Sequence, residues 1–142
     1  MSKEKTYKVT GVSHYIDNIK KLQVENVDYD YSKKELIENG YENERIYQYE
    51  FYPVKVELVP EPDNPYDPNA VKVIIDNELV GYIKSGSCKH ILKIIAEDRI
   101  EKIDCEIGGG NYKFIGYDED EEKYFYDKGE LSYFVHLTII EK

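Results

Sequence analysis

The sequence of 142 residues has no tryptophan, a single methionine and only two cysteines. Cys88 and Cys105 are far apart and form no CxxC pair, so the sequence predicts neither a disulfide framework nor a cysteine zinc site. Both are expected to behave as small buried apolar residues. No apolar run approaches the roughly 18 residues that cross a membrane, and the first residues, MSKEKT, lack the apolar segment of a signal peptide. We therefore expect a cytoplasmic protein with no membrane partner.

Catalytic and cofactor motifs are also missing. No GxxxxGK(S/T), HExxH, GxSxG or EF-hand pattern occurs. The triple glycine at 108–110 precedes a strand pattern rather than a helix, so it is not a phosphate loop. Three acids, Asp63, Asp67 and Asp76, imitate the carboxylate cluster of a metal-dependent nuclease. No basic catalytic residue accompanies them, however, and neighbouring prolines account for their turn positions. The sequence predicts a binding module with no cofactor and no metal, not an enzyme.

Positive charge is scarce as well. Charged residues make up 34% and hydrophobic residues 41% of the chain, as in a soluble globular protein, but the formal net charge is −10. Proteins that bind nucleic acid usually present a basic surface, because phosphate contacts supply much of their affinity. Residues 118–130 hold seven acids and two lysines and so carry half of this net negative charge. An acidic chain of this kind can bind the end of a nucleic-acid strand through a small local site, but it will not bind along an extended phosphate backbone.

The strongest local pattern lies in residues 57–84. Residues 55–59 alternate polar and apolar positions, as a half-buried strand does. Prolines at 60, 62, 65 and 68 then exclude both helix and central strand, and Asp and Asn residues between them favour successive turns. Residues 70–75 and 79–83 read as two strands joined by a hairpin turn at Asp76-Asn77. So rigid a loop is either a ligand-presenting element or a simple turn, and the pattern alone leaves both open.

The rest of the chain is rich in strand patterns separated by turn signals. Ser32 and Glu35 have capping-box spacing, which predicts a helix over 33–39 that Gly40 ends. Cys88, Ile91, Leu92 and Ile95 predict the apolar stripe of another helix. The expected strands are 6–12, 46–59 with a break at Pro53, 100–107, 112–115, 124–126 and 131–139, with turns at 108–110, 118–122 and 128–129. We predict a single, mainly β (α+β) domain over residues 1–142: a small OB- or SH3-like β-barrel with two or three short helices.

The run PEPDNPYDPNAVKV (60–73), followed by LVGYI (79–83) and a helix, closely resembles the HIRAN domain family. This β-barrel module occurs on Swi/Snf-class helicase-like ATPases of DNA repair and as stand-alone bacterial and phage proteins, and we expect this chain to be of the stand-alone kind. The resemblance covers residues 5–15 and roughly 54–107. A segment near 23–50 and an acidic hairpin near 116–130 depart from the family pattern.

The resemblance implies a nucleic-acid-binding module that grips a single-stranded DNA end with a free 3′-hydroxyl. Asp67 would accept a hydrogen bond from that hydroxyl, which a carboxylate can do and which a 3′-phosphate would oppose. Tyr66 and Tyr15 would stack on the last bases. The remaining members of the implied site are His14, Asp63, Asn64 and Tyr82. The last of these stands where animal homologues have histidine, and Ser13 stands where they have arginine, which removes a bidentate phosphate ligand.

Two other functions remain open at this point. A protein-interaction module would use the same cleft and the acidic hairpin to bind a basic protein partner without any DNA activity. Metal-dependent cleavage by Asp63 and Asp67 is a third interpretation. Lys89 and Lys93 lie one turn apart on the predicted second helix, where they form either part of a phosphate-facing patch or an ordinary solvated helix face.

Overall fold

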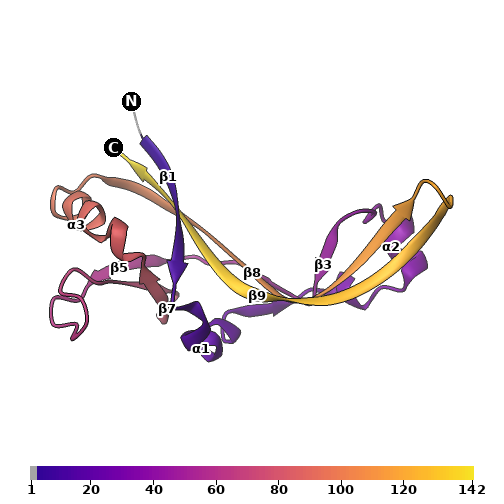
Figure 1. Ribbon diagram of the computed structural model, residues 1–142, viewed down its shortest axis with the longest axis horizontal. Coiled ribbons are helices and arrows are strands. Elements are labelled where there is room, and N and C mark those ends of the chain that lie inside the picture. The colour runs from indigo at the N-terminus through magenta and orange to yellow at the C-terminus, as the bar shows by residue number, and fades with distance from the viewer. Residues whose placement is uncertain (1–2) are drawn as a thin grey trace.

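Two long strands, β8 (Ile100–Asp118) and β9 (Lys123–Glu141), form a hairpin that runs through the whole molecule (Figure 1). The computed structural model describes residues 3–142. The other strands are β1 (Lys3–Thr10), β2 (Gln23–Glu25), β3 (Arg45–Tyr47), β4 (Tyr49–Phe51), β5 (Val56–Pro60), β6 (Val71–Ile75) and β7 (Glu78–Ile83). The α-helices are α1 (Ile16–Lys20), α2 (Lys33–Glu38) and α3 (Cys88–Ala96), and the 3₁₀ turns are η1 (Val12–Tyr15), η2 (Val27–Asp30) and η3 (Ser85–Ser87).

Seven strands make one antiparallel sheet in the order β3-β8-β9-β1-β7-β6-β5, and β2 and β4 pair separately. The predicted mainly β fold with short helices is confirmed, and the sheet curls into a half-barrel. Its two outer strands, β3 and β5, do not pair with each other within residues 3–142. No helix in this part of the chain is both long enough and apolar enough to cross a membrane.

The main core fills the inside of the curled sheet. It contains buried side chains from β1, β6, β7 and β9, such as Val9, Val73, Val80 and Leu137, and α3 covers it. In α3 the buried residues are Cys88, Ile91 and Ile94, whereas Leu92 and Ile95 are half-buried. The predicted apolar stripe is therefore present, but its buried centre is rotated slightly about the helix axis, toward Ile94. Cys105 is only half-buried, and both cysteines are free thiols.

A second, smaller core lies at the far end of the long hairpin. It is formed by Leu36 of α2, Ile46 of β3 and Ile115 of β8. The predicted capping box is present at the start of α2, where Ser32 Oγ accepts from the Glu35 N–H and the Glu35 carboxylate accepts from the Ser32 N–H. We call residues 110–131 of the β8–β9 hairpin, together with α2 and β3, the arm. Figure 1 shows it projecting away from the half-barrel.

The triple glycine does not form the predicted turn. Strand β8 continues through it, and the pairing register with β9 shifts between Gly108 and Gly110. Gly109 has φ 107°, and a Cβ there would lie 2.4 Å from the Ser132 carbonyl oxygen. Glycine thus permits a bulge that bends the strand without ending its ladder. The predicted turn at 128–129 is also wrong. Strand β9 continues through both residues, and each of them pairs with a residue of β8.

The predicted long strand over 46–59 is also wrong. The segment is divided into β3, β4 and β5, which pair with β8, β2 and β6 respectively. Pro53 lies between β4 and β5, where it has no ladder hydrogen bond to donate. The alternation of polar and apolar residues correctly indicates strands, but it does not show that the three strands pair with different partner strands.

Candidate functional site

The segment between β5 and β6, residues 61–70, is held as a rigid loop by its own backbone. The Glu61 N–H donates to the Ala70 carbonyl at 2.8 Å and closes the base of the loop. Two further bonds, from Asn64 N–H to the Glu61 carbonyl at 3.0 Å and from Ala70 N–H to the Asp67 carbonyl at 3.1 Å, make successive turns. With prolines fixing backbone angles between these turns, the loop presents its side chains in a defined arrangement.

Asn64 organises the middle of this loop. Its Oδ1 accepts from the backbone N–H of Tyr66 at 2.8 Å and of Asp67 at 3.0 Å. Asp67 in turn uses Oδ1 to accept from the Asn69 N–H at 2.8 Å. These side-chain-to-backbone bonds are those that make Asn and Asp favourable in turns. Within residues 3–142 the other carboxylate oxygen of Asp67, Oδ2, accepts no hydrogen bond, so it is available to a ligand.

The loop forms one wall of a pocket of about 600 Å³, which we call the loop pocket. Its lining residues are Thr10, Tyr15, Glu61, Asn64, Pro65, Tyr66, Asp67, Ala70, Tyr82, Ile83, Lys84 and Ser85. They come from the end of β1, from η1, from the loop itself and from β7 with the residues after it. The structure thus brings together five of the residues singled out in the sequence, although Tyr15 is some fifty positions from the loop.

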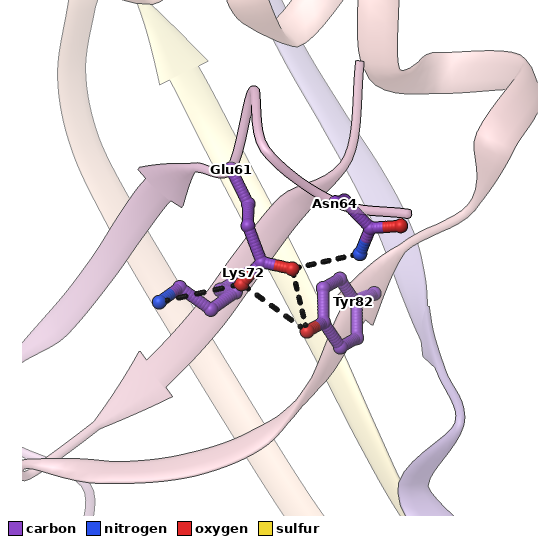
Figure 2. Close-up of polar contacts among 4 residues, drawn as sticks. All are labelled: Glu61, Asn64, Lys72 and Tyr82. Atoms are coloured by element: carbon purple, nitrogen blue, oxygen red, sulfur yellow. Dashed lines mark hydrogen bonds and ion pairs between the residues drawn. The ribbon is translucent and has the colours of Figure 1, made fainter. Parts of the chain in front are cut away.

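Glu61 connects the loop to the sheet (Figure 2), and sequence analysis missed it. Its carboxylate accepts from Asn64 Nδ2 at 2.7 Å and from the Tyr82 hydroxyl at 3.2 Å, and it pairs with Lys72 Nζ at 3.4 Å. The hydrogen bond from Asn64 is the largest of the effects that lower the pKa of Glu61 below its ordinary value of 4.5. Glu61 lies between Pro60 and Pro62, and no local sequence signal indicates its partners.

Three tyrosines line the loop pocket in different ways. The Tyr66 side chain is 95% exposed and projects from the loop. Tyr15 and Tyr82 form a tilted pair with ring centroids 6.4 Å apart. Burial is the main cause that raises the pKa of Tyr82 to about 12, with Tyr15 and Glu61 adding to it. Because its hydroxyl donates to Glu61, Tyr82 offers a ligand its ring rather than a free hydroxyl.

Two predicted site residues lie outside this pocket. Asp63 and His14 are both exposed, and neither contributes to its lining. Ser13 lines a different pocket, on the other side of η1. Lys89 and Lys93 are exposed on α3 and do not reach the loop pocket.

The acids of the metal-dependent interpretation do not converge. Among the described residues there is no group of three or more His, Cys, Asp or Glu side chains able to hold a metal ion. Asp76 lies in the β6–β7 hairpin, where its Oδ1 accepts from the Lys55 N–H at 2.7 Å and from the Val54 N–H at 3.1 Å. It therefore has a structural role at the start of β5, away from Asp63 and Asp67.

Comparison with known proteins gives one family. The family model of the HIRAN domain matches residues 6–103, which is more than half of the chain. A similar solved structure is the crystal structure of the HIRAN domain of human HLTF, with 19% sequence identity, a TM-score of 0.41, and coverage of 99% of this chain and 80% of that chain. At this score and identity the structural likeness adds no argument to the family match. None of the curated proteins matches the chain significantly.

Proposed function

The chain belongs to the HIRAN domain family, and from this premise we propose that its loop pocket binds the 3′-hydroxyl end of single-stranded DNA. Family membership supports a DNA-binding module in general. The finer proposal is carried by one observation: a single pocket holds an exposed tyrosine, a tyrosine pair and a carboxylate with one oxygen that accepts no hydrogen bond from residues 3–142.

Each predicted site residue then has a chemical role. Asp67 accepts the hydrogen bond of the terminal hydroxyl through Oδ2. Asn64 keeps Asp67 in place because its Oδ1 accepts from the backbone N–H of Asp67. Tyr66 stacks on a base, since its ring is free on both faces and base–aromatic stacking tolerates any base. Tyr15 and the ring of Tyr82 flank the same strand end. Exposed Asp63 and His14, beside the pocket, contact the strand just beyond it.

This mode of binding suits an acidic protein. Recognition of an end through stacking and one hydroxyl contact requires few phosphate contacts, and Lys84 is the one lysine of the pocket lining. Figure 1 places the loop and the acidic tip of the arm, residues 118–122, at opposite ends of the molecule. Charges separated by more than the Debye length, about 8 Å at physiological salt, are largely screened from each other.

Fluorescence anisotropy with a labelled oligothymidine at neutral pH and low salt tests the proposal. The strand with a free 3′-hydroxyl should bind at least about tenfold more tightly than the same strand with a 3′-phosphate. In Asp67→Asn the Oδ1 acceptor for Asn69 is retained, while the charged oxygen Oδ2 is replaced by an amide. This variant should bind the hydroxyl strand about tenfold more weakly, because a hydrogen bond to a charged group contributes about 1.5–3 kcal/mol, and it should tolerate the 3′-phosphate better than the native chain does.

Asp17→Asn is the matched control. Asp17 is an exposed acid on α1 outside the loop pocket, so this change removes the same charge without touching the site. It should leave the preference for the hydroxyl end unchanged. Equal affinity of the native chain for both strand ends, or no DNA binding at low salt, would contradict the proposal.

A second candidate function is the binding of a basic protein partner by the arm. The observation that favours it is the combination of seven acids in residues 118–130 with exposed aromatic side chains, Phe125 at 45% and Tyr126 at 41% exposure. Acids and aromatic faces both attract lysine and arginine. Nuclear magnetic resonance titration with a lysine-rich peptide should then shift arm resonances in the native chain, and not after residues 119–122 are changed to Gln and Asn. Unchanged arm spectra in the native chain would remove this candidate.

A further inference from the structure

The 3₁₀ turn η1 contributes residues to two pockets, the loop pocket and a second pocket of about 490 Å³. Tyr15 lines the first, whereas Ser13 and Ile16 line the second. Consecutive Cα atoms are 3.8 Å apart, so the Cα atoms of Ser13 and Tyr15 are separated by at most about 7.6 Å. A flexible polymer whose end lies in the loop pocket therefore needs to cross only one turn of backbone to enter the second.

Three amide side chains distinguish this second pocket, which we call the amide pocket. They are Gln23 of β2, Gln48 between β3 and β4, and Asn111 of β8. Asn111 Nδ2 donates to Gln48 Oε1 at 3.1 Å, and the Gln48 N–H donates to the Asn111 carbonyl at 2.9 Å. These bonds fix the two residues against each other and leave Asn111 Oδ1 and Gln48 Nε2 without a partner among residues 3–142.

Gln23 adds a hydrogen-bonding group that the protein does not satisfy. Its Oε1 is the one buried side-chain oxygen or nitrogen in the described part of the chain that has no hydrogen-bond partner. Burying such an acceptor without a partner is unfavourable, so an unpaired amide beside a pocket needs an explanation. A ligand in the pocket with a hydrogen-bond donor that reaches the Gln23 amide would supply one.

The lining selects the class of ligand. Lys20 and Glu130 are its only charged residues and are opposite in sign, which disfavours a compact polyanion. Amides carry donors and acceptors side by side, the pattern by which Asn and Gln recognise the edges of nucleobases. Tyr49 and Tyr133 add aromatic rings on which a base can stack. The volume also falls within the usual range of small-molecule sites.

We propose that the amide pocket receives a base of the same DNA strand, upstream of the 3′-terminal nucleotides held in the loop pocket. This inference rests on the proposed function and extends it from one subsite to two. It also gives a role to the segment near 23–50, since Gln23, Gln48 and Tyr49 come from it.

An abasic scan tests the proposal. Oligothymidines with a free 3′-hydroxyl carry one abasic nucleotide at each position from the second to the sixth from the 3′ end, and affinities are measured by anisotropy. An abasic nucleotide keeps the phosphate and loses the base. One internal position beyond the terminal pair should cost about tenfold in affinity, while its neighbours cost much less.

Two variants identify the pocket. Gln23→Leu removes the amide, and Gln23→Glu keeps its shape and adds a negative charge. Both should weaken hexanucleotide binding about tenfold, abolish the effect of the sensitive abasic position and leave dinucleotide binding unchanged. Lys34→Gln, an exposed change on α2, should alter none of these values. Melting temperatures near that of the native chain show that the variants are folded.

The outcomes separate the two proposals. A preference for the 3′-hydroxyl with no sensitive internal position, or with a sensitive position that persists in both Gln23 variants, overturns the amide-pocket inference and leaves the end-binding function standing. Absence of any binding to single-stranded DNA overturns both.

Discussion

Glu61 is the residue through which the loop is joined to the sheet, and its charge has a predictable effect on stability. Its folded-state pKa is lowered, chiefly by the hydrogen bond from Asn64. A lowered carboxyl pKa contributes stability that is fully present above the unfolded value, near 4.5, and is lost as the pH falls through the folded value. The ionised form of Glu61 therefore stabilises the loop at neutral pH.

We expect Glu61→Gln to be less stable than the native chain at pH 7, because glutamine can still accept from Asn64 but cannot pair with Lys72 as a charge. The difference should shrink progressively below pH 4.5. Urea denaturation of both proteins between pH 7 and pH 3 measures it. A difference that is constant over this range would show that the charge of Glu61 has no part in holding the loop.

Among the elements, β8 is the strand whose shape depends most on glycine. Its bend at Gly108–Gly110 carries the strand from the half-barrel into the arm, and the bulge needs a positive φ at Gly109. A side chain there meets two obstacles, the left-handed backbone conformation and the Ser132 carbonyl oxygen 2.4 Å from the new Cβ. Neither is a flexible group that moves aside at low cost.

Gly109→Ala should accordingly lower the free energy of unfolding by at least about 2 kcal/mol, since backbone strain and overpacking each cost about 1–3 kcal/mol. Gly86→Ala is the matched control, because no atom lies within 4 Å of its added Cβ and its φ is not positive. Chemical denaturation of the two variants gives the comparison. Equal stability of both would mean that the bend does not require glycine.

At the scale of the whole molecule, the two cores differ greatly in size. The main core joins strands from most of the sheet with α3, whereas the arm core has three buried residues, Leu36, Ile46 and Ile115. Regions with few buried apolar contacts open at lower free energy than the rest of a protein. The arm is thus expected to unfold locally while the half-barrel and the loop pocket on it remain formed.

Leu36→Ala tests this expectation. The cavity should cost about 2–5 kcal/mol, a loss that the arm alone absorbs. Amide exchange should accelerate in α2 and in the distal parts of β8 and β9, with resonances of the loop pocket unchanged. Ile91→Ala, at a fully buried position of α3 in the main core, should instead destabilise the whole chain. Loss of loop-pocket resonances in Leu36→Ala would show that the two cores unfold together.

The sequence by itself determined the local features of this protein. Strand patterns at residues 55–59, 70–75 and 79–83 predicted β5, β6 and β7, and Asp76-Asn77 predicted the turn between the last two, where both residues have positive φ. The sequence also predicted the capping box of α2 and the rigid loop over 61–70. Such features depend on sterics and hydrogen bonds within a few residues, so their signals lie in the nearby sequence. The roles given to the site residues came from family resemblance and stay predictions.

Only the tertiary structure decided which distant segments meet. It brought Tyr15 beside the loop, joined Glu61 to Tyr82, divided residues 46–59 among three partner strands and continued β8 through its glycines. A strand of given alternation pairs equally well with many neighbours, and the choice depends on the total apolar surface that the assembled sheet buries. That sum runs over residues far apart in the chain, so no short window of sequence contains it.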